Sequence, residues 1–175
     1  MSNLHCITVV LDDRLVTLNA AVGLLRRRNL PVRSVTFGPH VTEGRSRLLA
    51  MIEADEGAAQ RVALVFEKLI GVDEARSVPA ADTVVPRELA LIRIRTQADA
   101  YAELLDVLSL YHADVLEEGP DGVVVELTGP DTFVLSCLRA VERFGIVDVA
   151  RSGAVAIERP AERPRAPTSN EASVS

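Results

Sequence analysis

The chain has 175 residues, enough for one ordinary domain or for two small ones with separate cores. Its formal net charge of −6 gives no general positive field that would attract nucleic acid or an anionic membrane surface. Two cysteines, Cys6 and Cys137, are too few for a disulfide framework and lack the paired spacing of a zinc site. From the sequence we expect neither a signal peptide nor a membrane span. We therefore expect a cytoplasmic protein with neither a nucleic-acid nor a membrane partner.

The first part of the chain predicts the order strand, helix, strand, strand, helix, strand. Residues 4–11 form a β-branched apolar run that ends at the turn-forming pair Asp12 and Asp13. After this pair, apolar residues recur every three or four positions as far as three consecutive arginines, as in an amphipathic helix. The predicted strands are residues 4–11, 32–37, 46–54 and 72–78, and the predicted helices are residues 15–28 and 56–70.

The same order begins again after a short stretch rich in Pro and Ala. Pro120-Asp121-Gly122 has the composition of a hairpin connection, and Pro130 stands at a helix start, where proline is tolerated. The predicted strands here are residues 89–95, 115–116, 123–128 and one or two within 146–157, and the predicted helices are residues 98–112 and 131–144.

Two such passes predict an α+β fold with two ferredoxin-like βαββαβ domains, because right-handed crossovers place both helices of each unit on one face of an antiparallel sheet. The predicted division is a first domain over residues 1–79, a linker over 80–86, a second domain over 87–158 and a disordered tail over 159–175. The tail is rich in Pro, Ser and Ala and has almost no large apolar residues. Because each sheet would have one uncovered face, we expect at least a dimer.

The sequence contains no recognisable catalytic or metal-binding motif. His5, His40 and His112 are scattered over different elements, with no acid or cysteine at ligand spacing, so we expect no metal site and no catalytic residue. Lys68 lies in a segment that resembles an ordinary helix surface. An RNA-recognition sheet would need two or three aromatic residues on one face, but only Phe37 falls on a predicted strand.

Several stretches, in this order and spacing, resemble the small regulatory subunit of acetolactate synthase, which has an N-terminal ACT domain followed by a second ferredoxin-like domain. The similarity covers nearly everything from residue 5 to residue 157. The stretches are Val22-Gly23-Leu24-Leu25, Ser34-Val35-Thr36, Ser46-Arg47-Leu48, Glu67-Lys68-Leu69-Ile70, Arg87-Glu88-Leu89-Ala90-Leu91-Ile92-Arg93 and Val149-Ala150-Arg151-Ser152-Gly153-Ala154-Val155-Ala156.

The resemblance implies a subunit that performs no chemistry itself and that binds and activates a catalytic subunit. That partner, the large subunit of acetolactate synthase, condenses pyruvate with another 2-oxoacid in branched-chain amino acid biosynthesis. Thiamine diphosphate, Mg and FAD are expected on the partner, and no cofactor is expected on this chain. The resemblance also implies a homodimer through the ACT domains, with valine or another branched-chain amino acid bound between them as a feedback effector.

The effector site implied by the resemblance comprises Asp13, Arg14, Val16, Thr17 and Pro31. The family typically has Asn and Gly where this sequence has Asp13 and Val16, and a second Asn where it has Pro31. A β-branched Val blocks the close backbone approach that Gly permits, and Pro lacks an amide donor. An acidic residue also competes with a ligand carboxylate at a helix N-terminus. We therefore expect valine feedback to be weakened or lost.

Two other functional interpretations remain open. The first is a stand-alone ACT-type sensor that binds a small amino acid without contacting an acetolactate synthase. The second is a small enzyme with a ferredoxin-like fold, which would need polar side chains that converge in a pocket. Co-purification with a candidate catalytic subunit separates the regulatory subunit from the sensor.

Overall fold

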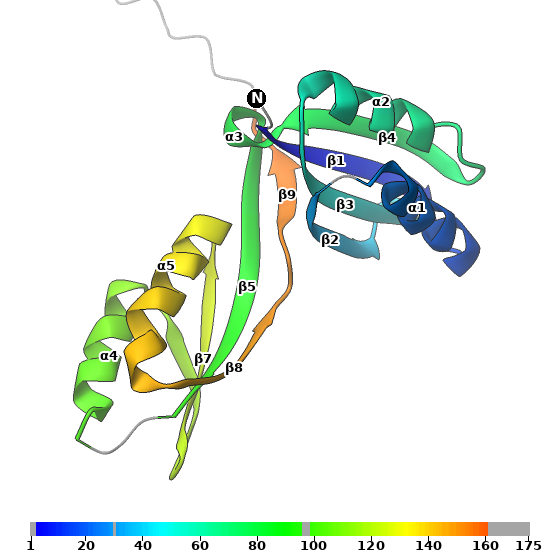
Figure 1. Ribbon diagram of the computed structural model, residues 1–175. Helices are drawn as coiled ribbons and strands as arrows, with labels where there is room; N and C mark the ends of the chain where they lie inside the picture. The colour runs from blue at the N-terminus through cyan, green and yellow to red at the C-terminus, as the bar shows by residue number, and fades with distance from the viewer. Residues whose placement is uncertain (1–2, 30, 96–98, 161–175) are drawn as a thin grey trace, which may run out of the picture.

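The structure, a computed structural model, describes residues 3–29, 31–95 and 99–160. Its first unit is a four-stranded antiparallel sheet in the order β2-β3-β1-β4, with two helices packed on one face (Figure 1). Its elements are β1 (Asn3–Asp12), α1 (Leu15–Arg28), β2 (Val32–Pro39), β3 (Arg45–Ala54), α2 (Glu56–Phe66) and β4 (Val72–Pro79).

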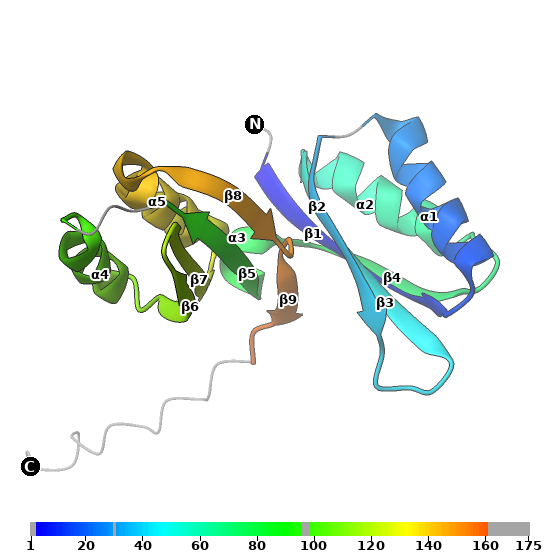
Figure 2. The ribbon, with the colours of Figure 1, turned by 90° about the horizontal axis from the view of Figure 1, so that it is seen from below.

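The second unit repeats the topology of the first. Its strands follow the order β6-β7-β5-β8, which is equivalent to the order in the first sheet (Figure 2). Its elements are β5 (Val84–Ile94), α4 (Tyr101–Leu110), β6 (Asp114–Gly119), β7 (Gly122–Gly129), α5 (Asp131–Val141), the 3-10 turn η1 (Glu142–Phe144) and β8 (Ile146–Arg151). The predicted α+β class with two ferredoxin-like βαββαβ units is confirmed.

Local chemistry explains where the helices of the first unit begin and end. The carboxylate of Asp55 accepts a hydrogen bond of 2.8 Å from the backbone N–H of Ala58 and so caps the start of α2. At the end of α1, Asn29 adopts a left-handed conformation with φ 48°. The prediction that the second helix reaches residue 70 is wrong. The helix ends at Phe66, because the chain continues in tight turns and reverses at Gly71, whose φ is +88°.

The segment predicted as a linker, residues 80–86, is not a plain connection. It contains the short helix α3 (Ala80–Thr83) and the first residues of β5. These residues become strand because β9 (Val155–Glu158) pairs with them, with Val84 opposite Glu158 and Arg87 opposite Val155. A partner about 70 positions along the chain supplies the backbone hydrogen bonds that the local sequence does not announce. The division into two separate domains at this point stays a prediction.

Other boundaries differ by a few residues. The predicted two-residue strand at 115–116 is the six-residue β6, because it forms a hairpin with β7. The predicted helix over 98–112 is α4, and residues 96–98 lie outside the described part of the chain. Most of the predicted tail, residues 161–175, also lies outside it, whereas Arg159 donates a backbone hydrogen bond of 2.8 Å to the carbonyl of Thr83.

Each unit has its own core between helices and sheet. Phe66 is the largest fully buried side chain of the first core, and Leu104 and Leu108 of α4 lie in the second. Both cysteines are buried, as predicted, and burial raises the pKa of the Cys137 thiol to about 11. In the described residues, no helix is long and apolar enough to cross a membrane.

A third, smaller cluster joins the two units. Cys6, Leu49 and Met51 lie on the helix-free face of the first sheet and pack against Ala80 and Val84. Val78, Ala154 and Ala156 complete this cluster. Part of the face that we expected to be bare is therefore covered by α3, β5 and β9 of the same chain (Figure 1).

Candidate functional site

Four of the five residues expected at an effector site lie in the turn from β1 into α1. Arg14 precedes the helix, and the backbone N–H of Thr17 donates a hydrogen bond of 3.1 Å to the Arg14 carbonyl. Thr17 is buried, whereas the side chains of Asp13 and Val16 point to solvent, and Val16 is 68% exposed. The structure therefore brings Asp13, Arg14, Val16 and Thr17 together at the start of α1.

The carboxylate of Asp12 organises this turn. It accepts a hydrogen bond of 2.9 Å from Nε of Arg14, and a second guanidinium nitrogen of Arg14 also contacts it. Hydrogen bonds from Arg14 and from the hydroxyl of Thr17 hold the pKa of Asp12 below its ordinary value. The start of α1 thus already holds an ionised carboxylate that belongs to the chain itself.

Gly71 lets the chain approach this carboxylate closely. The backbone N–H of Asp12 donates a hydrogen bond of 2.8 Å to the Gly71 carbonyl. A Cβ at position 71 would stand 2.5 Å from an oxygen of Asp12 and 2.9 Å from Oγ1 of Thr17. With a φ of +88°, this position also favours glycine by conformation. The turn is therefore closed from the side of β4 as well as from α1.

Pro31 lies apart from these residues within one chain. It follows the far end of α1, and a helix of this length is about 21 Å long. Pro31 is exposed, and its carbonyl accepts a hydrogen bond of 2.9 Å from the backbone N–H of Glu53. One protomer alone does not bring Pro31 to the other four residues.

A second polar cluster lies at the base of β5, in the stretches that carry the resemblance. Glu88 is 5% exposed, and its carboxylate pairs with the guanidinium of Arg151, which also contacts Asp131 at the start of α5. Burial works to lower the pKa of Arg151, but the hydrogen bonds to Asp131 and Glu88 outweigh it and hold that pKa above its ordinary value. The three side chains tie β5, β8 and α5 together.

The chain that follows Arg151 connects the two units. Ser152 and Leu89 exchange hydrogen bonds, one of 2.9 Å between backbones and one of 3.0 Å to the Ser152 hydroxyl. Further on, Oγ1 of Thr36 on β2 donates a bond of 3.3 Å to the Ala154 carbonyl, and the Ala154 N–H lies 3.4 Å from Oγ of Ser34. We call residues 152–156 the junction segment, because it leaves the second sheet and lies against the first.

Reasoning from the sequence alone missed the roles of Glu88, Arg151 and Ser34. Glu88 and Arg151 are 63 positions apart, and a single sequence offers no signal that pairs them. Ser34 looks like any polar residue of an edge strand. The sequence predicts no metal site. Among the described residues, no three His, Cys, Asp or Glu side chains lie together in a way that could hold a metal ion.

Comparison with known proteins shows which family of proteins the chain is similar to. Residues 87–160 match a family model described as the small subunit of acetolactate synthase. The acetolactate synthase small subunit of Mycobacterium bovis is 30% identical over 161 residues, which cover 89% of this chain and 92% of that protein. A probable acetolactate synthase small subunit of Archaeoglobus fulgidus is 27% identical over 155 residues, with coverage of 89% and 96%.

A solved structure supports the same fold. The crystal structure of the acetolactate synthase small subunit from Thermotoga maritima superposes with a TM-score of 0.84, at 23% identity, over 90% of this chain and 98% of that one. The chain belongs to the acetolactate synthase small-subunit family. It is a regulatory subunit of branched-chain amino acid biosynthesis that is not catalytic alone, and the holoenzyme makes acetolactate.

Proposed function

We propose that this chain binds the large, catalytic subunit of acetolactate synthase and raises its turnover. The match to small subunits over nearly the whole chain carries this proposal. The reaction would take place on the partner, with thiamine diphosphate, Mg and FAD bound there. The buried Glu88–Arg151 pair and the junction segment support the proposal, because they give two thin sandwiches a fixed surface to present to a partner.

Co-expression with a candidate catalytic subunit tests this function. We expect the two chains to elute together from a sizing column, and we expect acetolactate formation per catalytic subunit to exceed that of the catalytic subunit alone. If the chains elute separately and turnover is the same with and without this chain, the stand-alone sensor becomes the better interpretation. We place the complex in the cytoplasm, where free cysteines such as Cys6 persist; cell fractionation tests this location.

We further propose that valine feedback is weak or absent in this subunit. The start of α1 favours one anion, but the carboxylate of Asp12 already lies there and Asp13 adds a second negative charge. Val16, which has a branched side chain, occupies a position in the same turn where close approach of a ligand carboxylate to the backbone would need a glycine. Pro31 offers no backbone donor.

The double variant Asp13→Asn/Val16→Gly tests this proposal in the holoenzyme. We expect the unmodified holoenzyme to keep its activity in millimolar valine and the double variant to become inhibited. Leu15→Ala is the control, because Leu15 is 79% exposed on the same turn and supplies no group to a ligand. Strong valine inhibition of the unmodified holoenzyme would contradict the proposal.

We also propose that two copies associate through the β2 edges of their N-terminal units. Val32, Val35 and Phe37 lie on this edge strand and remain about 40% exposed. Edge pairing would continue the sheet across the two copies and bring Pro31 of one copy toward the other. Analytical ultracentrifugation tests this: Phe37→Glu is expected to give monomers, and Val41→Glu, at a fully exposed loop residue, is expected to leave the dimer intact. A dimer that survives Phe37→Glu would overturn this interface.

A further inference from the structure

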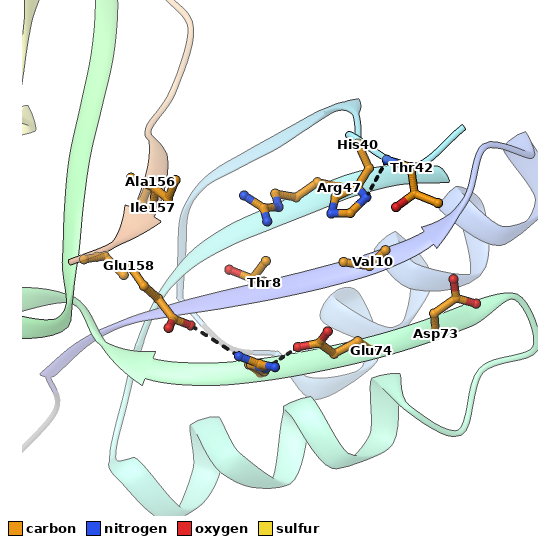
Figure 3. A pocket seen from close by; sticks show the side chains of 12 residues that line it. Thr8, Val10, His40, Thr42, Arg47, Asp73, Glu74, Ala156, Ile157 and Glu158 are labelled. Carbon is orange, nitrogen blue, oxygen red and sulfur yellow. Dashed lines mark hydrogen bonds and ion pairs between the residues drawn. The ribbon is translucent and has the colours of Figure 1, made fainter. Parts of the chain in front are cut away.

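A cleft lies on the helix-free face of the first sheet, beside the part that α3, β5 and β9 cover. Its volume is about 520 Å³, within the range of about 300–1,000 Å³ typical of small-molecule sites. Thr8 and Val10 of β1 form the floor, and Ile157 and Glu158 of β9 close one end (Figure 3). The cleft is thus built by both units of the chain, and it lies on the opposite face of the sheet from α1.

The acidic side chains around the cleft are already matched by arginines. Asp73 pairs with Arg45, and Glu74 pairs with Arg76. Glu158 is held more loosely, because its nearest oxygen is 3.9 Å from a guanidinium nitrogen of the same Arg76. These groups therefore offer no strong binding site for a free cation.

Arg47 differs from these charged residues, because its own charge is not paired among the described residues. Its side chain extends from β3 along the cleft toward β9 (Figure 3). Its Nε is buried without a hydrogen-bond partner, and Arg47 forms no ion pair with any residue that the structure describes. A buried guanidinium nitrogen without an acceptor is costly, and the positive charge of Arg47 is left available to an anion in the cleft.

We propose that this cleft binds a small metabolite through its carboxylate, with Arg47 as the group that binds it. A guanidinium presents two parallel donors that match the two oxygens of a carboxylate. The three carboxylates around the cleft offset most of the charge of its arginines, so the cleft has little net positive charge and a singly charged anion fits better than a phosphate dianion. Val10, Val84 and Ile157 supply apolar surface for the rest of the ligand.

The ligand would also connect the two units. β9 has four residues and, among the strands that the structure describes, pairs with the start of β5 alone, so few contacts hold it against the first sheet. A molecule bound between Arg47 on β3 and Ile157 on β9 would add contacts across this boundary. The bound state would therefore restrain β9, which gives the proposal a second observable besides affinity. Neither observable involves the catalytic subunit or the turn before α1.

Calorimetric titration of the full-length chain tests the proposal. The probes are L-leucine, 4-methyl-2-oxopentanoate, which has the same side chain but no ammonium group, and inorganic phosphate. We expect at least one carboxylate to bind and Arg47→Gln to lower its affinity about tenfold or more. The control is Arg33→Gln on the neighbouring strand β2, which removes a surface ion pair to Glu53 and is expected to change nothing. A matching thermal midpoint for Arg47→Gln would show that the variant is folded.

The two carboxylate probes show whether the cleft recognises the carboxylate alone or the ammonium group as well. If leucine alone binds, the ammonium group contributes and Glu158→Gln should weaken binding as well. If both bind equally, the carboxylate suffices and Glu158→Gln should have no effect. Hydrogen exchange should slow in β9 when either probe binds. The proposal is overturned if neither carboxylate binds, if phosphate binds as tightly as the better carboxylate, or if Arg47→Gln binds normally.

Discussion

The two halves of the molecule have the same fold but treat the free faces of their sheets differently. In the second sheet, Leu91 and Ala150 on the helix-free side remain exposed. In the first sheet, Cys6, Leu49 and Met51 on that side are buried under α3, β5 and β9. The difference arises because β5 and β9 extend beyond the second sheet and lie on the first. Duplication of a fold has therefore not duplicated its surfaces.

The same asymmetry separates the polar sites. The second unit holds the buried Glu88–Arg151 pair, which is satisfied within the chain. The first unit holds Arg47, whose buried Nε has no hydrogen-bond partner among the described residues. We infer that the second unit acts mainly as a rigid support, whereas the first unit and its border with β9 are the place for a ligand.

The largest expected effect tests whether the halves unfold separately. Phe66→Ala should destabilise the first unit by about 4 kcal/mol, because it leaves a cavity in a fully buried core. Both tyrosines, Tyr101 and Tyr111, belong to the second unit, so tyrosine fluorescence reports that unit alone. Circular dichroism reports both units.

In a urea titration of Phe66→Ala, we expect circular dichroism to show an early transition that tyrosine fluorescence does not follow. Leu64→Ala, at a half-exposed position of the same helix, is the control and should unfold close to the unmodified chain. Coincident transitions by both probes would mean that the chain unfolds as one unit and that the predicted division at residues 80–86 is not a folding boundary.

Local patterns were sufficient to predict the repeated fold. Apolar spacing in residues 15–28 predicts α1 with its observed bounds, and the β-branched run at 4–11 predicts nearly all of β1. Two of the failures share one cause. The start of β5 and the full length of β6 depend on partner strands elsewhere in the chain, and periodicity cannot reveal them.

The next largest effect is expected at the Glu88–Arg151 pair of the second unit. Arg151→Met should cost about 3 kcal/mol, because it leaves the buried carboxylate of Glu88 without its cation. The double variant Glu88→Gln/Arg151→Met removes both charges and should recover much of this loss. The free energies of unfolding from urea titrations, followed by tyrosine fluorescence, measure both effects. If the double variant is as unstable as the single one, the charge pair is not the reason for the loss.

A smaller effect is expected where the two units meet. Gly153 has a φ of +75°, and a Cβ there would stand 3.1 Å from Cβ of Ser34. Gly153→Ala should therefore cost about 1 kcal/mol from backbone strain. It should also speed hydrogen exchange in β9, because the junction segment loses its fit to β2. Gly38→Ala, where a Cβ would meet nothing within 4 Å, is the control. Unchanged exchange in β9 would show that the junction segment does not hold this strand.

The candidate sites were less predictable than the fold. The acidic turn at Asp12 and Asp13 is visible in the sequence, but the bonds that Asp12 forms with Arg14 and Thr17 are not. Arg47 lies within a stretch quoted for its resemblance, yet only the packed structure shows that its Nε lacks an acceptor. The sequence shows which residues are charged. It does not show which charges pair, because the partners come from other strands.

The smallest expected effect is a pH dependence confined to the first unit. The pKa of Asp12 is lowered in the folded chain, so its ionised form stabilises the fold above the ordinary Asp pKa of about 4. This contribution is lost as the pH falls through the lowered pKa. At pH 7, Asp12→Asn should therefore be less stable than the unmodified chain, and the difference in stability should shrink as the pH falls below about 4.

Asp13→Asn on the same turn is the control, because Asp13 is exposed and should show no comparable change. The measurement is urea unfolding at several pH values, with circular dichroism for both units and tyrosine fluorescence for the second. A gap that stays constant with pH, or one that appears equally in tyrosine fluorescence, would contradict a carboxylate that acts only in the first unit.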